Sequence, residues 1–256
     1  MFSFGYHPPI LMYHSVTLSF EAPFPNAVCI HPSVFAKQMQ YLKDHNYHVV
    51  DLDFLFQKIT QGEKILPKTL AITFDDGHLD NYVNAFPILK SHKIPATIFL
   101  ITGSIEKNPK FMTWDQAREM ENYGIRFGNH TATHPHLDLI SPEMARKEIL
   151  EGKEKLSQEL KNPSKIFCYP FGGYTLPIQR VVQECGYEGA VATSVDSVLP
   201  LADRYAFRRL KISDHANSNF IFAFEISGYY SVLQKVRKRI KSIKKKFLET
   251  SKGDAP

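Results

Sequence analysis

Two short segments of the chain carry side chains that could bind a metal ion and hydrolyse a bond. In residues 73–77, Asp75 and Asp76 are adjacent, and in residues 128–134, His130 and His134 lie four positions apart. Two histidine nitrogens and one carboxylate oxygen make a three-ligand set with an open position, as in catalytic zinc sites. The remaining aspartate is then available as a general base. Together the segments predict metal-assisted hydrolysis.

Each segment alone has a simpler explanation. Asp-Asp-Gly is common in turns, and most histidines are surface or hydrogen-bonded groups. The chain has 11 histidines, and we assign His78, His92 and His136 to that ordinary class. We expect His130 and His134 to lie on one face of a helical turn, from which both rings can reach one ion.

Both segments follow short apolar runs that we predict to be strands. Such runs occupy residues 10–13, 48–50, 70–74, 96–100, 125–128, 166–169, 189–193 and 207–210. Roughly eight alternations of strand and helix favour an α/β barrel, with a doubly wound open sheet as the alternative. Both topologies place active sites at the carboxyl ends of strands, where the two segments fall.

Helix boundaries are readable between these strands. Pro32 and Ser33 open one helix, and Thr113 with Gln116 forms a capping box for another. Ser141 followed by proline begins a long helix to about residue 160. Gly186 ends a helix over residues 176–185.

Composition limits the function class. The net charge is +5, but the basic residues concentrate after residue 229, and the mildly acidic remainder excludes a nucleic-acid-binding surface. The three cysteines form no metal-binding pair and are expected to be reduced thiols, which suits the cytoplasm. We find no signal peptide and no membrane-spanning run. We expect one domain over residues 1–228 and a basic segment over 229–256.

Apolar residues recur in the basic segment at spacings of three or four. This pattern predicts a basic amphipathic helix suited to an anionic membrane surface or an acidic glycan. The alternative is a final helix packed on the domain with a solvated basic face. The expected location is the cytoplasm, with contact at the inner face of the membrane. The apolar residues are Val232, Val236, Ile240, Ile243 and Phe247.

Three motifs in this order resemble the polysaccharide deacetylases, carbohydrate esterase family four. They are Thr-Phe-Asp-Asp-Gly at 73–77, His-Thr-x-x-His at 130–134 and Tyr-Pro-Phe-Gly at 169–172. The resemblance implies a distorted (β/α) barrel of seven or eight parallel strands. It also implies a divalent ion, held by Asp76, His130 and His134, and a base, Asp75. The ion would be zinc, although cobalt, nickel or iron would fit the same ligands.

The resemblance extends to the substrate groove. It implies that the backbone N–H of Phe171 stabilises the oxyanion and that Trp114 and Tyr174 line the sugar groove. Many members carry an arginine two residues before the motif proline, where this chain has Cys168. Arg209 is our candidate for the missing cation. This departure, and the opening at residues 10–16, resemble the poly-N-acetylglucosamine deacetylases.

The implied reaction removes N-acetyl groups from N-acetylhexosamine residues and releases acetate. Water activated by the ion is the nucleophile, and a histidine protonates the leaving amine. His14, which follows the strand over residues 10–13, fits this role better than His215, which follows a polar stretch. We expect His14 near the metal and opposite Asp75, with His215 remote.

Two other functions remain open. A glycoside hydrolase would use paired carboxylates across a glycosidic bond, but Asp75 and Asp76 are sequence neighbours and the histidines would then have no role. A non-catalytic glycan-binding protein on the same fold is the other alternative. The substrate is open among peptidoglycan, chitin-like oligomers, poly-N-acetylglucosamine and lipid-linked sugars.

Overall fold

Seven parallel strands close into a barrel in the computed structural model, which describes residues 8–18, 29–193 and 203–227. The strands are β1 (Ile10–Tyr13), β5 (Thr69–Phe74), β6 (Thr97–Leu100), β7 (Arg126–Asn129), β8 (Ile166–Cys168), β9 (Gly189–Thr193) and β10 (Phe207–Lys211). The order runs β1-β10-β9-β8-β7-β6-β5, and β1 pairs with β5 to close the ring. The predicted barrel is therefore confirmed, and the open sheet is excluded.

The predicted strand over residues 48–50 is not one of the seven strands that close the barrel. Within the described residues, it forms β4 (His48–Val49) and pairs only with Thr69 and Leu70 at the start of β5. The neighbouring β6 pairs with β5 further along, at Thr73 and Phe74. A separate two-stranded sheet pairs β2 (Ser15–Val16) with β3 (Cys29–Ile30).

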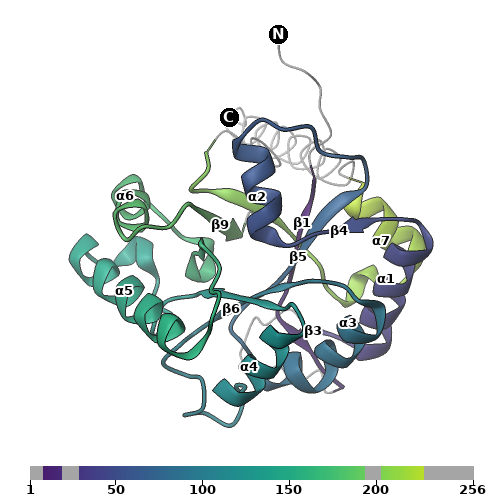
Figure 1. Cartoon of the computed structure of the whole chain (residues 1–256), viewed down its shortest axis with the longest axis horizontal. Helices are drawn as coiled ribbons and strands as arrows, with labels where there is room; N and C mark the ends of the chain where they lie inside the picture. Colours follow the sequence, from purple (N-terminus) through teal and green to yellow (C-terminus); the bar gives the residue numbers. More distant parts are fainter. Residues whose placement is uncertain (1–7, 19–28, 194–202, 228–256) are drawn as a thin grey trace, which may run out of the picture.

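Helices surround the barrel (Figure 1). The α-helices are α1 (Pro32–Asp44), α2 (Leu52–Thr60), α3 (Phe86–His92), α4 (Trp114–Asn122), α5 (Pro142–Glu159), α6 (Leu176–Glu184) and α7 (Asn219–Ile226). A π-helix, η1 (Asn81–Ala85), precedes α3, and three 3-10 turns are η2 (Leu137–Leu139), η3 (Pro170–Gly172) and η4 (Asp214–Ala216).

Helix ends follow the sequence signals. The Thr113–Gln116 capping box is present, and the Ser141 side chain accepts from the Met144 N–H at the start of α5. Gly186 follows α6 with φ 78, a conformation that favours glycine. Each satisfied end removes free backbone donors or acceptors.

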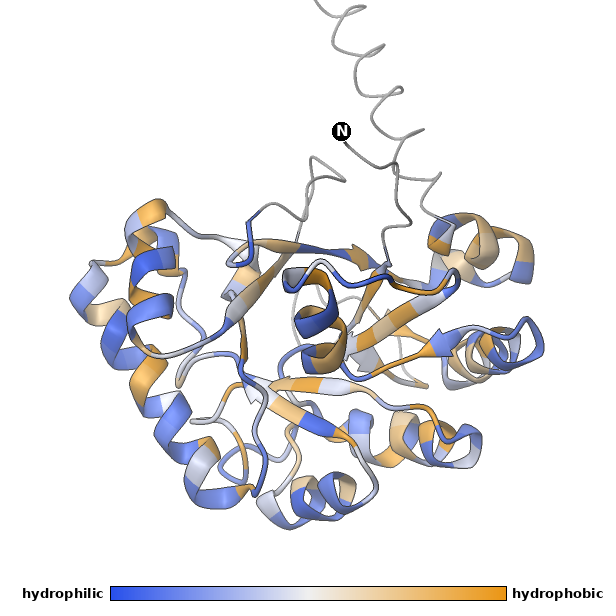
Figure 2. Ribbon diagram, turned by 45° about the horizontal axis from the view of Figure 1, so that its top comes forward, coloured by the Kyte–Doolittle hydropathy of each residue, from blue (hydrophilic) through white to orange (hydrophobic). Residues whose placement is uncertain are grey.

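Buried hydrophobic residues form two groups, one inside the barrel and one between the barrel and the surrounding helices. Alternate residues of the strands point inward, where Ala71, Phe99 and Phe207 pack with Leu55 and Phe56 of α2. Helix α2 therefore closes one end of the barrel. The outward residues meet the surrounding helices, whose outer surfaces are mostly hydrophilic with some exposed apolar residues (Figure 2). The other end of the barrel, at the carboxyl ends of the strands, is left for polar groups.

No helix within the described residues is both long and apolar enough to cross a bilayer. Cys168 and Cys185 are buried free thiols, and Cys29 is a half-buried one. The predicted basic helix over residues 229–256 lies outside the described residues, so its structure and its membrane contact remain predictions.

Candidate active site

Polar side chains converge at the carboxyl ends of the strands. Asp75 and Asp76 follow β5, His130 follows β7, and His14 follows β1. Arg209 projects inward from β10 and is buried. Parallel strands bring these residues to one end of the barrel although they are far apart in sequence.

Asp76, His130 and His134 form a compact set of possible metal ligands. The Oδ1 atom of Asp76 lies 3.6 Å from His130 Nε2 and 3.5 Å from His134 Nε2. The two Nε2 atoms are 3.2 Å apart. Tetrahedral coordination with bonds of about 2.0 to 2.1 Å requires ligand atoms roughly 3.3 Å apart. The three separations therefore fit one ion.

A hydrogen bond outside the ligand set orients His130. Its Nδ1 lies 2.9 Å from the Cys168 carbonyl oxygen. A carbonyl can only accept, so Nδ1 carries the proton and Nε2 keeps a lone pair for an ion. This arrangement is typical of metal-binding histidines.

The predicted helical turn at His130–His134 is wrong. The segment is a loop in which Thr131 and His134 have φ values of 68 and 64. The Thr131 N–H donates to Asn129 Oδ1 at 2.8 Å, and the His134 N–H donates to Thr131 Oγ1 at 2.9 Å. These side-chain acceptors replace the bonds of a helix, and the loop still brings the two rings together.

Left-handed backbone conformations gather around the site. Among the described residues, eight residues other than glycine have positive φ, and four of these are Asp76, Thr131, His134 and Phe171. Such conformations are costly for residues with a side chain and persist only where the surrounding structure holds them. Half of these strained residues therefore lie in or beside the candidate ligand set.

Burial disfavours the charged forms of all three candidate ligands. Burial, and secondarily the Asp75 carboxylate, raises the pKa of Asp76 to about 7. Burial also lowers the pKa of His130 to about 3 and that of His134 to about 4. The imidazoles are thus neutral, as metal ligands must be. A divalent cation would favour the ionised form of Asp76.

Arg209 holds the Asp75 carboxylate through both oxygens. Its Nη1 donates to Oδ1 at 2.6 Å and its Nη2 donates to Oδ2 at 2.7 Å. Burial alone would raise the pKa of Asp75, but the Arg209 charge and hydrogen bonds outweigh it and lower that pKa. Asp75 is therefore ionised at neutral pH. The Cys168 Sγ lies 3.1 Å from Arg209 Nη2.

His14 is a neighbour of Asp75 rather than opposite to it. Its Nε2 lies 3.8 Å from Asp75 Oδ2, so the expected separation across the site is not seen. Burial lowers the pKa of His14, and the Asp75 carboxylate partly offsets this. The side chain of His215, in η4, lies outside the described part of the structure, so the two histidines are not compared.

The segment that carries His14 is fixed by η1 and the residue before it. Asn81 Nδ2 donates to the His14 carbonyl at 2.7 Å. Asp80 accepts from the Val16 N–H at 3.2 Å and from the Ser15 hydroxyl. π-Helices are frequent at functional sites, and this one secures the His14 backbone beside the Asp75–Asp76 turn.

His78, which we assigned to the ordinary surface or hydrogen-bonded histidines, lies beside the candidate ligand set. It is buried, and its Nε2 lies 3.5 Å from Asp76 Oδ2, on the carboxylate oxygen that does not face the histidine pair. The only signal in the sequence is its position two residues after Asp76. Sequence reasoning therefore missed a close neighbour of the candidate ligand set.

The predicted groove residues lie at different distances from the site. The Phe171 ring is 4.5 Å from the His134 ring, centre to centre, and Tyr174 packs against Tyr169 at 5.0 Å. Trp114 is only 2% exposed and lines a pocket with Thr133 and Lys155. The roles of these three residues remain predictions.

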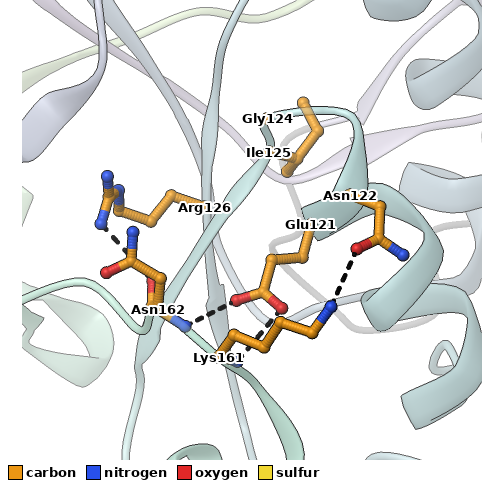
Figure 3. A pocket seen from close by; sticks show the side chains of 7 residues that line it. All are labelled: Glu121, Asn122, Gly124, Ile125, Arg126, Lys161 and Asn162. Atoms are coloured by element: carbon orange, nitrogen blue, oxygen red, sulfur yellow. Dashed lines mark hydrogen bonds between the residues drawn. The ribbon is translucent and has the colours of Figure 1, made fainter.

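A pocket at the amino end of β7 is lined by polar groups that already make structural contacts (Figure 3). Glu121 accepts from the backbone N–H groups of Lys161 at 3.1 Å and Asn162 at 2.9 Å. Lys161 Nζ reaches Asn122 Oδ1 at 3.4 Å. These bonds tie the end of α4 to the segment after α5, at the end of the barrel opposite the candidate metal ligands.

Comparison with known proteins identifies the class. The family model described as polysaccharide deacetylase matches residues 63–190. YxkH of Bacillus subtilis is 31% identical over 205 residues, covering 80% of this chain and 71% of YxkH. The poly-beta-1,6-N-acetyl-D-glucosamine N-deacetylase of Staphylococcus aureus strain MRSA252 is 29% identical over 203 residues, covering 74% of this chain and 69% of that protein.

A solved structure agrees with this class. The Streptococcus pyogenes deacetylase PplD, in complex with acetate, aligns with a TM-score of 0.76 and 28% identity, covering 84% of this chain and 96% of PplD. This chain therefore belongs to the polysaccharide deacetylase family, whose members are metal-dependent hydrolases. The family confirms the resemblance seen in the three motifs and implies an acetylated polysaccharide as substrate.

Proposed function

We propose that this chain hydrolyses the N-acetyl groups of N-acetylglucosamine residues in a glycan, with one divalent ion held by Asp76, His130 and His134. The observation that carries the proposal is the spacing of the three ligand atoms, 3.2 to 3.6 Å. The similarity to the staphylococcal deacetylase supports this sugar and a poly-N-acetylglucosamine substrate. Zinc suits the N, N, O ligand set.

When bound, a divalent ion would polarise the acetyl carbonyl and acidify the attacking water, so that a carboxylate of low basicity suffices as proton acceptor. Asp75 accepts that proton. Arg209 keeps the carboxylate ionised and fixes its plane through two hydrogen bonds. The Phe171 N–H donates to the oxyanion, a contact typically worth about 3 kcal/mol.

His14 delivers a proton to the leaving amine. Its Nε2 is 3.8 Å from Asp75 Oδ2, so the proton that Asp75 takes from water has a short path to the amine. Catalytic hydrogen bonds are often longer in a protein without substrate than in its complex with substrate. The products are acetate and a glycan with a free amine.

The test measures acetate released from a panel of N-acetylated glycans by the metal-reconstituted protein. We expect release from poly-N-acetylglucosamine and none by His130→Ala. Shortened chains without acetate would indicate a glycoside hydrolase instead. Glycan binding without either product would indicate a non-catalytic protein.

A further inference from the structure

The loop between the two candidate histidine ligands is held by residues outside the ligand set. Residues 131–133 connect His130 to His134, and the backbone is left-handed at both Thr131 and His134. Such conformations persist only where the surrounding structure holds them. The positions of the two imidazole rings therefore depend on the contacts that hold this loop.

Glu148, on α5, makes three hydrogen bonds to the middle of the loop. Its backbone carbonyl accepts from the Ala132 N–H at 3.2 Å. Its side chain accepts from the Thr133 N–H at Oε2 and from the Thr133 hydroxyl at Oε1, each at 2.8 Å. Each carboxylate oxygen thus has its own donor on Thr133. We call these two side-chain bonds the Glu148 clamp.

The segment after β6 contributes further bonds to the same loop. The Gly103 N–H donates to the Ala132 carbonyl at 2.8 Å, and the Thr102 N–H donates to the Thr131 carbonyl at 3.1 Å. A Cβ at residue 103 would lie 2.5 Å from the Ala132 carbonyl oxygen, so glycine allows this approach. These bonds are made by the backbone, whereas the Glu148 clamp depends on one side chain that a substitution can change.

Helix α5 gives the Glu148 clamp a fixed support. Ile149, the next residue, is buried, and its carbonyl accepts from Asn129 Nδ2 at 2.8 Å. Asn129 is the last residue of β7 and immediately precedes His130. The helix is therefore attached to the strand that carries the first histidine ligand. Groups on such elements position a site more precisely than groups on loops.

We propose that Glu148 is a positioning residue for the metal ion. The Glu148 clamp holds the His130–His134 loop in the conformation in which both Nε2 atoms face one ion, and it sets the metal affinity without touching the ion. The proposal rests on the proposed function, because it assumes the metal site, and it extends that site to α5. If the contact only stabilised the fold, its loss would lower the melting temperature and leave the metal affinity unchanged.

The test compares Glu148→Ala with Glu148→Gln in the full chain and measures the Kd for zinc by competition with a chelator. Alanine is the best helix former, so α5 should persist in Glu148→Ala. We expect this variant to raise the zinc Kd about 10-fold, at the lower end of the effect of residues that support metal ligands. The melting temperature of its metal-free form should fall by no more than about 4 °C.

Glu148→Gln should restore tight binding. The glutamine carbonyl can accept from the Thr133 N–H, and its amide can donate to the Thr133 hydroxyl oxygen. Both bonds of the Glu148 clamp are then kept without the charge, and the zinc Kd should stay within about twofold of that of the unchanged protein. A Kd as weak as that of Glu148→Ala would overturn the proposal.

The matched control is Glu151→Ala, about one turn further along α5. The Glu151 carboxylate lies 3.7 Å from Lys147 Nζ on the same helix, and its removal should leave the zinc Kd unchanged. An equal rise in Glu151→Ala, or an unchanged Kd in Glu148→Ala, would overturn the proposal.

Hydrogen exchange separates a failure of the proposal from a failure of the proposed function. If the unchanged protein binds no zinc, the metal site itself is wrong. In the metal-free protein, the Thr133 amide should exchange faster in Glu148→Ala than in Glu148→Gln or the unchanged protein. Equal exchange in all three would show that the Glu148 clamp does not hold the loop.

Discussion

Arg209 and Asp75 form a buried bidentate ion pair, with N–O distances of 2.6 and 2.7 Å, across 134 positions of sequence. The Arg209 side chain is fully buried, and its guanidinium lies over the Phe99 ring inside the barrel. The pair thus sits between the apolar interior and the candidate metal ligands. It links the stability of the barrel to the ionisation of the proposed base.

Removing Arg209 alone should destabilise the fold. Arg209→Met leaves the Asp75 carboxylate buried and unpaired, which typically costs about 3 to 5 kcal/mol. The double variant Arg209→Met with Asp75→Asn should recover more than half of this loss, since no buried charge remains. Urea denaturation of the single and double variants measures the coupling. Losses that simply add would mean that the two residues do not stabilise each other.

Asp75→Asn should keep the metal and lose most of the turnover. The carboxylate is not among the three ligand atoms, and a general base typically contributes about 100- to 10,000-fold. Metal content by mass spectrometry and acetate release are measured on the same sample. Near-normal acetate release would refute the role of Asp75 as base.

Asn81 should affect catalysis through His14. Asn81→Asp removes the donor to the His14 carbonyl and adds a second carboxylate beside Asp80. A small displacement of a catalytic group can reduce turnover about 10- to 100-fold, and we expect such a fall in kcat with KM and metal content unchanged. Asn122→Asp, at the opposite end of the barrel, is the control. Equal losses in the two variants would indicate general destabilisation.

Glu225, in α7, should make stability depend on pH. Its Oε2 is buried without a hydrogen-bond partner among the described residues, and burial raises its pKa to about 7. Between about pH 4.5 and 7, the folded protein keeps a proton that the unfolded chain has lost, so stability falls as pH rises through this window.

Glu225→Gln should remove that dependence. We expect the variant to be more stable than the unchanged protein at pH 8, by about 1 kcal/mol after allowance for solvent screening, and equal to it at pH 4. Thermal unfolding at the two pH values measures the difference. A gain at pH 4 that matched the gain at pH 8 would contradict the assignment.

The sequence predicted the barrel and the candidate ligand set of Asp76, His130 and His134 because those signals are local. Apolar runs ending at Asp75 and His130 identify strands whose carboxyl ends must meet, and the capping residue Thr113 marks a helix directly. The left-handed loop at 131–134 was not predictable, because it depends on the Asn129 and Thr131 side chains binding nearby backbone. The burial of His78 depends on packing from several elements, which periodicity does not report.

The distant partners were partly predictable. Because this chain has Cys168 where many family members have an arginine, we looked for another cation and chose Arg209. The closed barrel places β10, the strand of Arg209, between β1 and β9. The role of Asp80 and Asn81 had no such signal, because their partners, His14 to Val16, are supplied by barrel closure between β1 and β5. Contacts between sequence-distant loops follow from topology and not from any one segment.

The most direct test of the account adds zinc in steps to the metal-stripped protein and records bound zinc and acetate release in the same samples. We expect bound zinc and acetate release to rise together and to saturate at one equivalent of zinc. In His130→Ala, both should stay near zero, whereas His48→Ala, with its exposed histidine, should behave like the unchanged protein. Acetate release that is independent of bound zinc, or zinc binding that survives in His130→Ala, would contradict it.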